Sequence, residues 1–287
     1  MTRRVALATC AAWPDLDVDG PELLAALAAE GLDVQVHAWD SGIDWSVFDL
    51  VVIRTTWDYW DHHDAYLAWT RSVPRLANPA EVVAWNTDKT YLRRLAEAGI
   101  PTIPTTWIEP GEPFTPPDHP FVVKATVSAG ARDTAAYPAG DTAAVAHVGA
   151  LHAAGKTVML QPYLDAVDSA GETAVLCFDG EVSHGGYKSA VLRVGGGQPG
   201  LGAWEVGGRE VTDAEAELAR RVLEVAQSWG SDLLYARVDL LPGPVLIELE
   251  VTEPSLFLGF TPGSAARFAR AVRRWADASS GAATSPS

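Results

Sequence analysis

Residues 235–254, YARVDLLPGPVLIELEVTEP, constrain the fold more than any other stretch, because they alternate apolar and polar side chains on both sides of a Pro-Gly-Pro turn. This alternation is typical of two half-buried β-strands joined as a hairpin. Arg237 and Asp239 share one face of the first strand, and Glu248 and Glu250 share one face of the second. The segment therefore predicts a hairpin that carries three carboxylates on one face.

The three carboxylates point to a divalent-metal site. A four-residue turn, Pro242 to Val245, would put Asp239 directly opposite Glu248, with Glu250 on the diagonal. Such a cluster repels itself unless a cation lies within it, and Mg²⁺ prefers hard oxygen ligands of this kind. The alternative is an acidic hairpin face in contact with solvent. Arg237 in the same row and the leucine-rich back of the hairpin favour a cleft instead.

The overall composition limits the partners and the compartment. The formal net charge is −16 and the chain has no lysine- or arginine-rich run, which argues against a nucleic acid or an anionic membrane as partner. The two cysteines, Cys10 and Cys177, lie in apolar runs, and we interpret them as reduced core thiols. Neither a secretion signal nor a membrane span is indicated. We therefore expect a cytoplasmic protein of two or three packed units.

The N-terminal part predicts a β-α-β unit with a parallel sheet. Val5–Thr9, Val34–Ala38 and Leu50–Ile53 are short apolar runs, and a helix between the first two begins around Pro21 and ends before Gly31. Strand, helix and strand in this order are typical of an α/β sheet.

The third strand ends in a charged, aromatic-rich segment, Arg-Thr-Thr-Trp-Asp-Tyr-Trp at residues 54–60. Because ligands of open α/β sheets bind beyond the carboxyl ends of the strands, we interpret this segment as a wall of a substrate site, in which Arg54 could bind a carboxylate. The alternative is that its aromatic residues anchor the following helix and pack between domains. The residues predicted to contact substrate are Arg54, Thr55, Trp57 and Tyr59.

Two lysines of the central part are candidates for binding an anion. Lys89 is expected in the first turn of a helix over Tyr91–Ala98, where a cation opposes the helix dipole, so an anionic ligand would explain its position. Lys124 lies in an apolar strand before a loop of small residues, including Ser128 and Gly130, whose backbone N–H groups can point at phosphates. The alternatives are a solvated lysine and an ordinary β-turn.

Val158–Leu164 predicts a strand that could border an adenine ring. Gln161 and Tyr163 are its polar members, and Asp168 follows as a carboxylate for a ribose. Pro162 predicts that this strand lies at the edge of its sheet, because proline cannot donate a hydrogen bond to a neighbouring strand.

A second hairpin is predicted around Asp179-Gly180, a dipeptide that strongly favours a tight turn between strands. Lys188 stands at its end. Arg193 and the glycine-rich run 195–200 follow, and we expect this run to form a mobile lid over a site. The alternative for both cations is surface charge.

The order of these parts resembles the ATP-grasp superfamily, and within it the glutathione-synthetase-like branch. The resemblance covers most of the chain and is carried by Lys89 before Gly-Ile-Pro, Lys124 in Val-Val-Lys-Ala, Gln-Pro-Tyr-Leu at 161–164 and Glu-Leu-Glu-Val-Thr at 248–252. It implies the α/β fold class, α+β in the nucleotide part, with an ATP-grasp fold after an N-terminal parallel α/β domain. The implied domains are 1–85 (N-terminal α/β), 86–178 (central, with the ATP-binding lid) and 179–278 (C-terminal, with the metal hairpin), before a disordered tail, 279–287.

The resemblance also implies roles in nucleotide binding. Lys89 and Lys124 would contact the ATP phosphates, and residues 161–164 would hold the adenine. Asp168 or Glu172 would bind the ribose. The predicted nucleotide-binding residues are Lys89, Lys124, Ser128, Gly130, Gln161, Pro162, Tyr163, Leu164, Asp168 and Glu172.

The implied metal is Mg²⁺, with two ions expected beside the transferred phosphoryl group and Mn²⁺ as an alternative. The family commonly has asparagine where Glu250 stands, and an Asn-x-x-Pro-Gly ending where this chain has Thr-Glu-Pro-Ser, so the number of metal ligands is open. The predicted metal ligands are Asp239, Glu248 and Glu250, and the predicted catalytic residues are Lys188, Arg193 and Arg237.

On this resemblance we expect an ADP-forming carboxylate-amine ligase that acts on a small amino-acid-like substrate through an acyl phosphate. The segments Arg-Thr-Thr-Trp-Asp-Tyr and Glu-Pro-Ser-Leu-Phe are similar, more narrowly, to a small group that includes the cycloserine-forming O-ureidoserine cyclo-ligase, which implies ring closure within one substrate. The alternatives are an ATP-grasp kinase and an ATP-binding protein without turnover. The choice between a monomer and a homodimer is open.

Overall fold

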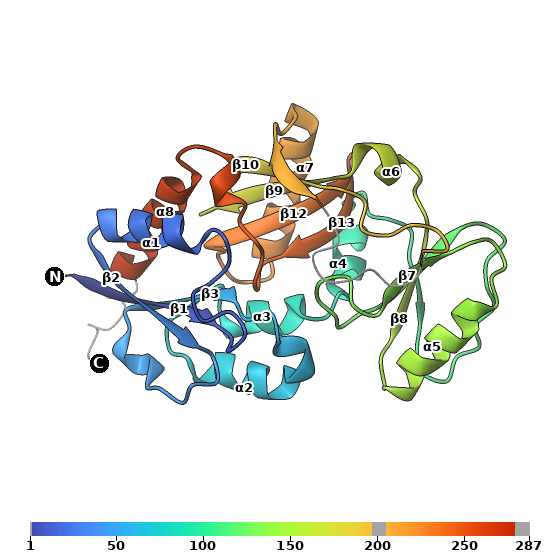
Figure 1. The fold of residues 1–287 in the computed structure, drawn as a ribbon, viewed down its shortest axis with the longest axis horizontal. Helices are drawn as coiled ribbons and strands as arrows, with labels where there is room; N and C mark the ends of the chain where they lie inside the picture. The colour runs from blue at the N-terminus through green and yellow to red at the C-terminus, as the bar shows by residue number, and fades with distance from the viewer. Residues whose placement is uncertain (1, 197–204, 279–287) are drawn as a thin grey trace.

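The computed structural model describes residues 2–196 and 205–278. Its strands form three sheets, and the sheet that contains the predicted metal hairpin lies between the other two (Figure 1). The last four residues of the expected glycine-rich lid, 197–200, and the expected tail, 279–287, lie outside the described residues. Within the described residues, every helix is too short or too polar to cross a bilayer.

The N-terminal sheet confirms the predicted parallel β-α-β unit. Its elements are β1 (Arg3–Thr9), α1 (Gly20–Ala29), β2 (Leu32–Ala38), the 3-10 helix η1 (Trp45–Val47), β3 (Leu50–Thr55), η2 (Tyr59–Asp61), α2 (His63–Ser72) and β4 (Leu76–Ala77). The strand order is β2-β1-β3-β4, and each neighbouring pair is parallel. Val5 and Leu7 of β1 pack with α1 and the C-terminal helix α8 (Ser264–Ala278), while Ala6 and Ala8 face aromatic residues around α2. Both faces of the sheet are therefore apolar, as its continuous hydrophobic strands require.

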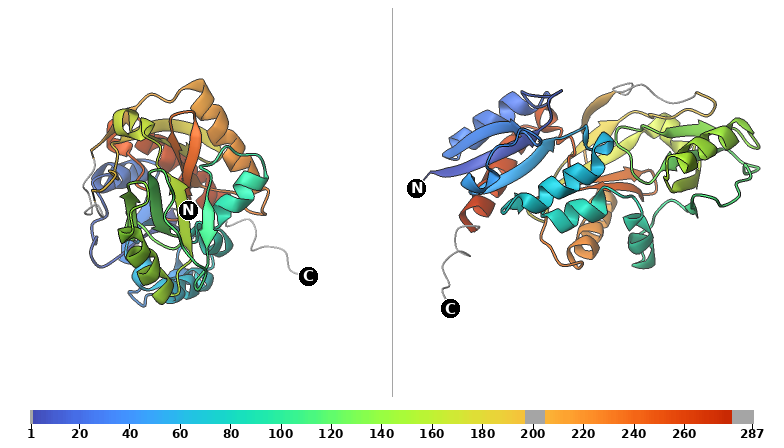
Figure 2. Two further views of the ribbon diagram at one scale, coloured as in Figure 1. Left: turned by 90° about the vertical axis from the view of Figure 1, so that its right-hand side faces the viewer. Right: turned by 90° about the horizontal axis from the view of Figure 1, so that it is seen from below.

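The second sheet forms one end of the molecule (Figure 2). Its elements are β5 (Thr106–Ile108), β6 (Phe121–Ala125), β7 (Thr134–Tyr137), α5 (Ala143–Ala153) and β8 (Val158–Pro162). The strands are antiparallel in the order β5-β8-β6-β7, so the expectation that Pro162 marks an edge strand is wrong. Proline is tolerated there because β5 pairs with β8 only as far as Leu160, so Pro162 has a neighbour on one side alone.

The third sheet contains both predicted hairpins. Its elements are β9 (Glu172–Phe178), β10 (Glu181–Lys188), β11 (Val206–Arg209), α7 (Asp213–Gln227), β12 (Tyr235–Leu241) and β13 (Val245–Glu250). The order is β11-β10-β9-β12-β13, with all pairs antiparallel, and α7 covers one face. The proposed domain boundary at 178/179 would separate β9 from β10, which pair with each other, and it remains a prediction.

The remaining elements connect the sheets and carry one correction. They are α3 (Ala80–Asn86), α4 (Tyr91–Glu97), α6 (Ala166–Ala170) and η3 (Leu258–Phe260). Lys89 was expected in the first turn of a helix, but α4 begins at Tyr91 with Thr90 as its N-cap, so Lys89 precedes the helix. The argument from the helix dipole therefore does not apply to Lys89 as stated.

The β12–β13 hairpin confirms the predicted pairing of its two strands, because Asp239 lies directly opposite Glu248. The expected turn length is wrong: Val245 already belongs to β13 and pairs with Leu241, so the turn has three residues. A register shift next to Asp239 adds one residue to β13 and restores the predicted pairing.

Candidate functional site

A charged cluster lies where β9, β10 and β12 run side by side. Lys188 ends β10, and its Nζ lies 2.7 Å from Glu172 Oε2 and 2.7 Å from Asp239 Oδ2. Strand pairing explains this convergence, because Lys188 is the register partner of Glu172. Asp239 pairs with Ala174, two residues further along β9 and on the same face.

Arg237 completes this cluster from β12. Its Nε and Nη2 each donate a hydrogen bond of 2.9 Å to Asp239, one to each carboxylate oxygen. The guanidinium also contacts Glu250, its register partner on β13. Burial by itself raises the pKa of Asp239, but the charges of Arg237 and Lys188 lower it below the ordinary value. Asp239 is thus an ionised carboxylate whose two oxygens are both occupied by protein cations.

The two glutamates of β13 are less fully neutralised. Burial raises the pKa of Glu250 to about 7, with the charges of Asp239 and Glu248 adding to the rise and that of Arg237 opposing it. Glu248 Oε1 lies 3.1 Å from Lys89 Nζ. The Glu248 and Glu250 side chains are 27% and 25% exposed, against 1% for Asp239. Their oxygens therefore remain accessible to a ligand.

These carboxylates fit Mg²⁺ in donor chemistry, since all of them offer hard oxygen ligands. Residues 2–196 and 205–278 contain no group of three His, Cys, Asp or Glu side chains arranged to hold a metal ion. Protein cations instead bind some of these carboxylates: Lys188 and Arg237 bind Asp239, and Lys89 binds Glu248. Glu248 and Glu250 are the residues open to a metal ion, whereas Asp239 would first have to release a cation. The three-ligand site remains a prediction.

Two lysines border the cluster from other elements. Lys89 Nζ donates to the Ser128 carbonyl at 2.6 Å, in addition to its contact with Glu248. Lys124 on β6 is buried, and its ammonium has no hydrogen-bond or ion-pair partner among the residues that the structure describes. Burial lowers the pKa of Lys124, because the charged form is poorly solvated. A buried cation without a partner is suited to an anionic ligand.

The loop between β6 and β7, predicted to bind phosphates, has an unusual backbone. Ala131 and Asp133 have φ angles of 57° and 55°, in the left-handed region that non-glycine residues rarely adopt. Lys156 Nζ lies 2.6 Å from Asp133 Oδ2, and the Arg132 guanidinium lies 3.7 Å from the ring centroid of Trp60. These contacts fix the loop against the N-terminal unit and offset its strain.

The predicted adenine segment, residues 161–164, spans the end of β8 and the residues beyond it. Gln161 is buried, and its side-chain amide donates to the Thr105 hydroxyl at 2.8 Å. The Tyr163 hydroxyl donates to Asp168 Oδ1 at 2.5 Å, and Asp168 itself is exposed. Of the two predicted ribose ligands, Asp168 is open to a ligand, whereas Glu172 is buried and paired with Lys188.

Arg54 and Thr55, predicted to contact substrate, are fully buried. Arg54 is 2% exposed, its Nη2 donates to the Pro254 carbonyl at 2.8 Å, and its guanidinium lies 5.7 Å from the ring centroid of Tyr235. The Thr55 hydroxyl lies 2.6 Å from that of Thr9. Both residues join parts of the protein to each other, and their predicted role in substrate binding remains untested.

Trp57 and Tyr59 lie nearer the carboxylates. The Trp57 Nε1–H donates to the Glu253 carbonyl at 2.9 Å. Burial raises the pKa of Tyr59 well above its usual value, and the charges of Glu253, Glu248 and Glu250 add to this rise. Both side chains therefore border the acidic side of the hairpin.

The predicted catalytic residues separate into two groups. Lys188 and Arg237 meet at Asp239. Arg193 is exposed and forms no ion pair within the described part of the chain, so the structure does not bring it into the cluster.

The sequence analysis used residues 251–256, which follow β13, only for the family resemblance and predicted no role for them in the site. Every carbonyl in this segment accepts a hydrogen bond of 2.7 to 3.5 Å from a side chain. The donors, in order along the segment, are Asn78, Tyr235, Trp57, Arg54, Arg237 and His184. Most of them come from distant parts of the chain, so no local pattern could have predicted these hydrogen bonds. Its backbone, including that of Glu253, has a fixed course beside the carboxylate cluster.

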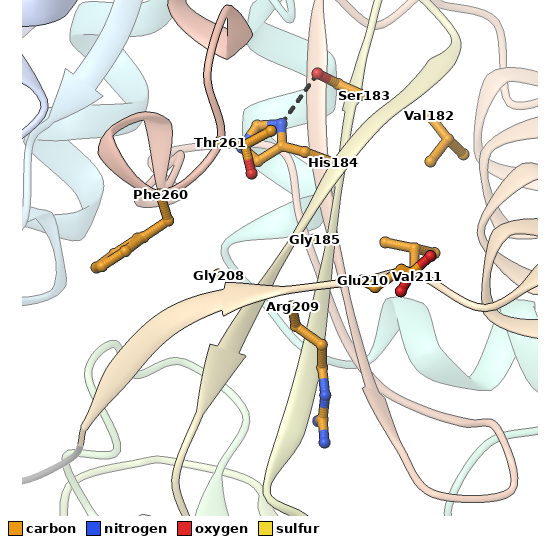
Figure 3. Close-up of a pocket in the computed structure, with 10 residues that line it drawn as sticks. All are labelled: Val182, Ser183, His184, Gly185, Gly208, Arg209, Glu210, Val211, Phe260 and Thr261. Atoms are coloured by element: carbon orange, nitrogen blue, oxygen red, sulfur yellow. Dashed lines mark hydrogen bonds between the residues drawn. The ribbon is translucent and has the colours of Figure 1, made fainter.

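A pocket of about 550 Å³ opens at the other end of β10 (Figure 3). It is lined by residues 182–185, 208–211 and 260–261 and includes none of the predicted site residues. His184 in its wall is hydrogen-bonded through both ring nitrogens, to the Ser183 hydroxyl and the Leu256 carbonyl. The charged cluster around Lys188 is therefore the stronger candidate for the functional site.

Comparison with known proteins gives a consistent set of relatives. A family model described as D-cycloserine synthetase DcsG, N-terminal domain, matches residues 5–78. The chain is 36% identical over 292 residues to the cycloserine biosynthesis protein DcsG of Streptomyces lavendulae, which covers 93% of this chain and 97% of the relative.

Solved structures agree with this result. The crystal structure of D-cycloserine synthetase DcsG is similar with a TM-score of 0.85 and 34% identity over 95% of this chain and 99% of that one. The D-alanine–D-alanine ligase of Bacillus anthracis has a TM-score of 0.64 and 13% identity, with 98% of each chain covered. The ATP-grasp ligase PsnB, solved with its minimal precursor, Mg and ADP, has a TM-score of 0.58 and 15% identity over 95% and 97% of the two chains. The last two likenesses concern the fold alone.

Proposed function

Because this chain belongs to the family of the D-cycloserine synthetase DcsG, we propose that it closes a ring within one small amino-acid-like substrate of the O-ureidoserine type, forming cycloserine. The expected α/β ATP-grasp fold is confirmed, and the protein is an ADP-forming ligase of the ATP-grasp class. The finer proposal concerns which atoms react and which residues bind them.

The reaction has two steps. A carboxylate oxygen of the substrate attacks the γ-phosphorus of ATP, the bond to the ADP oxygen breaks, and an acyl phosphate forms. A nitrogen of the same substrate then attacks the acyl carbon, the bond to the phosphate oxygen breaks, and phosphate leaves with that oxygen. Starting from an O-ureido substrate, cycloserine forms only if, beyond these two steps, one water also cleaves the bond between this nitrogen and the carbamoyl carbon, so that the carbamoyl group leaves as CO₂ and ammonia. No protein nucleophile is needed.

Cationic side chains support the first step. Lys124, buried without a partner, and Lys89 next to the loop carbonyl of Ser128 would bind the triphosphate. Lys188 and Arg237 would lie beside the phosphoryl group and the substrate carboxylate, whose charges otherwise repel each other. Residues 161–164 would border the adenine and Asp168 the ribose, while Glu172 would hold Lys188 in place.

Glu248 and Glu250, with Asp239 as a third ligand, would hold Mg²⁺, which when bound neutralises phosphate oxygens. Use of ATP and Mg²⁺ is general among the ATP-grasp relatives, one of which was solved with Mg and ADP. Two bound ions are our proposal for this chain.

The observation that carries the proposal is the fixed constellation of Lys188, Arg237 and Asp239, which leaves two cations on one face of a sheet beside accessible carboxylates. The test is incubation with Mg-ATP, O-ureidoserine and hydroxylamine, which traps an acyl phosphate as a hydroxamate. We expect ADP and hydroxamate from the wild type, loss of both from Lys188→Met, and no change in the exposed control Arg270→Met. ADP without hydroxamate would favour the alternative, a kinase that phosphorylates a hydroxyl, and AMP would exclude the ligase reaction.

A further inference from the structure

Glu253 is a buried carboxylate that none of the proposed steps uses. It is 8% exposed, and among residues 2–196 and 205–278 its carboxylate has no hydrogen-bond or ion-pair partner. Burying an ionised carboxylate without a partner is costly, so such groups are rare outside functional sites. The backbone at Glu253 is held in place, because the Trp57 indole donates a hydrogen bond to the Glu253 carbonyl and Arg54 donates one to the Pro254 carbonyl. The side chain therefore cannot move into solvent by a shift of the backbone.

The surroundings of Glu253 place it at the reaction centre. Burial, together with the charges of Glu250 and Glu248, raises the pKa of Glu253 to about 8 against the opposing charges of Lys89 and Arg237. The backbone agrees with this placement: Glu253 follows Glu250 by three residues, and the carbonyl of Ser255, two residues further on, accepts a hydrogen bond from Arg237 Nη1 at 3.5 Å.

The protein cations in this neighbourhood are already engaged. Lys89 binds Glu248 and the Ser128 carbonyl. Arg237 binds Asp239 and Glu250. Neither cation forms an ion pair with Glu253, and Lys124, whose ammonium has no partner among the described residues, is not one of the main charges that act on Glu253. A cation brought by a ligand would therefore satisfy this carboxylate.

We propose that the Glu253 carboxylate binds the ammonium group of the amino-acid substrate and so determines which end of the substrate faces the phosphoryl group. The inference rests on the proposed function, in which the substrate is an amino acid. An amino acid carries its ammonium two bonds from the carboxylate carbon. With the ammonium at Glu253, the substrate carboxylate would lie on the side of Arg237, where the phosphoryl group would arrive. The indole of Trp57 and the ring of Tyr59 then border the same end of the substrate.

The substitution Glu253→Gln keeps the shape of the side chain and removes its charge. Loss of a charge-assisted ion pair should raise the KM for O-ureidoserine about 10- to 100-fold, with little change in kcat and none in the KM for ATP. For an analogue in which hydrogen replaces the α-amino group, wild type and Glu253→Gln should have equal kcat/KM. The exposed Glu181→Gln, on β10 of the same sheet, is the matched control and should behave as wild type.

Folding stability separates this role from a structural one. Because Glu253 has no partner, Glu253→Gln should unfold at the same denaturant concentration as wild type or a higher one. A destabilised variant, or one whose KM for substrate is unchanged while the wild type turns over, would overturn the inference and leave the proposed function intact. A shift in the Mg²⁺ dependence alone would assign Glu253 to the metal and overturn it as well. Absence of ADP release by the wild type with any amino acid would remove the proposed function and this inference together.

Discussion

Asn86 controls the position of the strand that bears the two accessible glutamates, and its replacement by alanine should destabilise the protein strongly. Its amide nitrogen donates to the Leu249 carbonyl at 2.7 Å, and its oxygen accepts from the Val251 N–H at 3.0 Å and the Thr252 hydroxyl at 2.9 Å. β13 is an edge strand, so these bonds replace those that a further strand would make.

The magnitude follows from what each group loses. The Leu249 carbonyl keeps a second donor, the Tyr91 hydroxyl at 2.8 Å, so losing the hydrogen bond from Asn86 costs about 1 kcal/mol. The Thr252 hydroxyl loses a bond of similar worth. The Val251 N–H would be left buried without an acceptor, which costs about 1 to 3 kcal/mol by itself. Asn86→Ala should therefore lower the free energy of unfolding by roughly 3 to 5 kcal/mol.

Thermal unfolding followed by circular dichroism tests this directly. For a chain of this size, 1 kcal/mol corresponds to about 2 to 4 °C, so the Tm of Asn86→Ala should fall by at least about 6 °C. Ser228→Ala is the control, because it removes one exposed hydrogen bond to the Val225 carbonyl and should change the Tm by less than about 2 °C. If the two variants melted together, the side-chain bonds to β13 would not stabilise it as the distances imply.

Three further outcomes are expected. Lys124→Met should weaken binding of a fluorescent ATP analogue about 10- to 100-fold. It should not lower the free energy of unfolding, because it removes a buried cation that has no partner in the described residues. Unchanged affinity for the analogue would contradict this role. Burial lowers the pKa of His184, so below about pH 6.5 the unfolded chain binds a proton that the folded protein does not. The free energy of unfolding should therefore decrease as the pH is lowered, by up to about 1.4 kcal/mol per pH unit. Urea titration should show a steeper decrease in wild type than in His184→Gln. Cys10 and Cys177 are buried free thiols, as the sequence predicted. Burial raises the pKa of both thiols, that of Cys177 to about 12. A thiol reagent at pH 8 should therefore label neither cysteine in the folded protein and both in denaturant.

The parts of the fold that local patterns determine were predictable. Alternation of side chains predicted the β12–β13 hairpin, and the Asp179-Gly180 dipeptide predicted the β9–β10 hairpin. The register of these strands brings Lys188, Arg237 and Asp239 onto one face. The pairing of Asp239 with Glu248 was right although the turn was one residue shorter than expected, because a bulge in β13 compensates. A bulge has no signature in a single sequence, so that agreement was partly fortunate.

The parts that long-range contacts determine were not predictable. Pro162 indicated an edge strand, but the limited length of β5 lets it lie in an interior one. Arg54 has the chemistry of a carboxylate ligand, yet it is buried against the carbonyl of Pro254, 200 residues away in sequence. Glu253 stood outside the alternation of the hairpin, and only the fixed backbone of residues 251–256 makes it conspicuous.

The central claim is that a substrate carboxylate accepts the phosphoryl group beside Lys188 and Arg237. Transfer of ¹⁸O tests it most directly: O-ureidoserine labelled in its carboxylate is incubated with the protein and Mg-ATP, and the released phosphate is analysed by mass spectrometry. An acyl-phosphate route predicts one labelled oxygen in each phosphate, because the bond from carbon to that oxygen breaks when nitrogen attacks. Release of unlabelled phosphate with ADP would show that the carboxylate was never phosphorylated, and it would contradict the account.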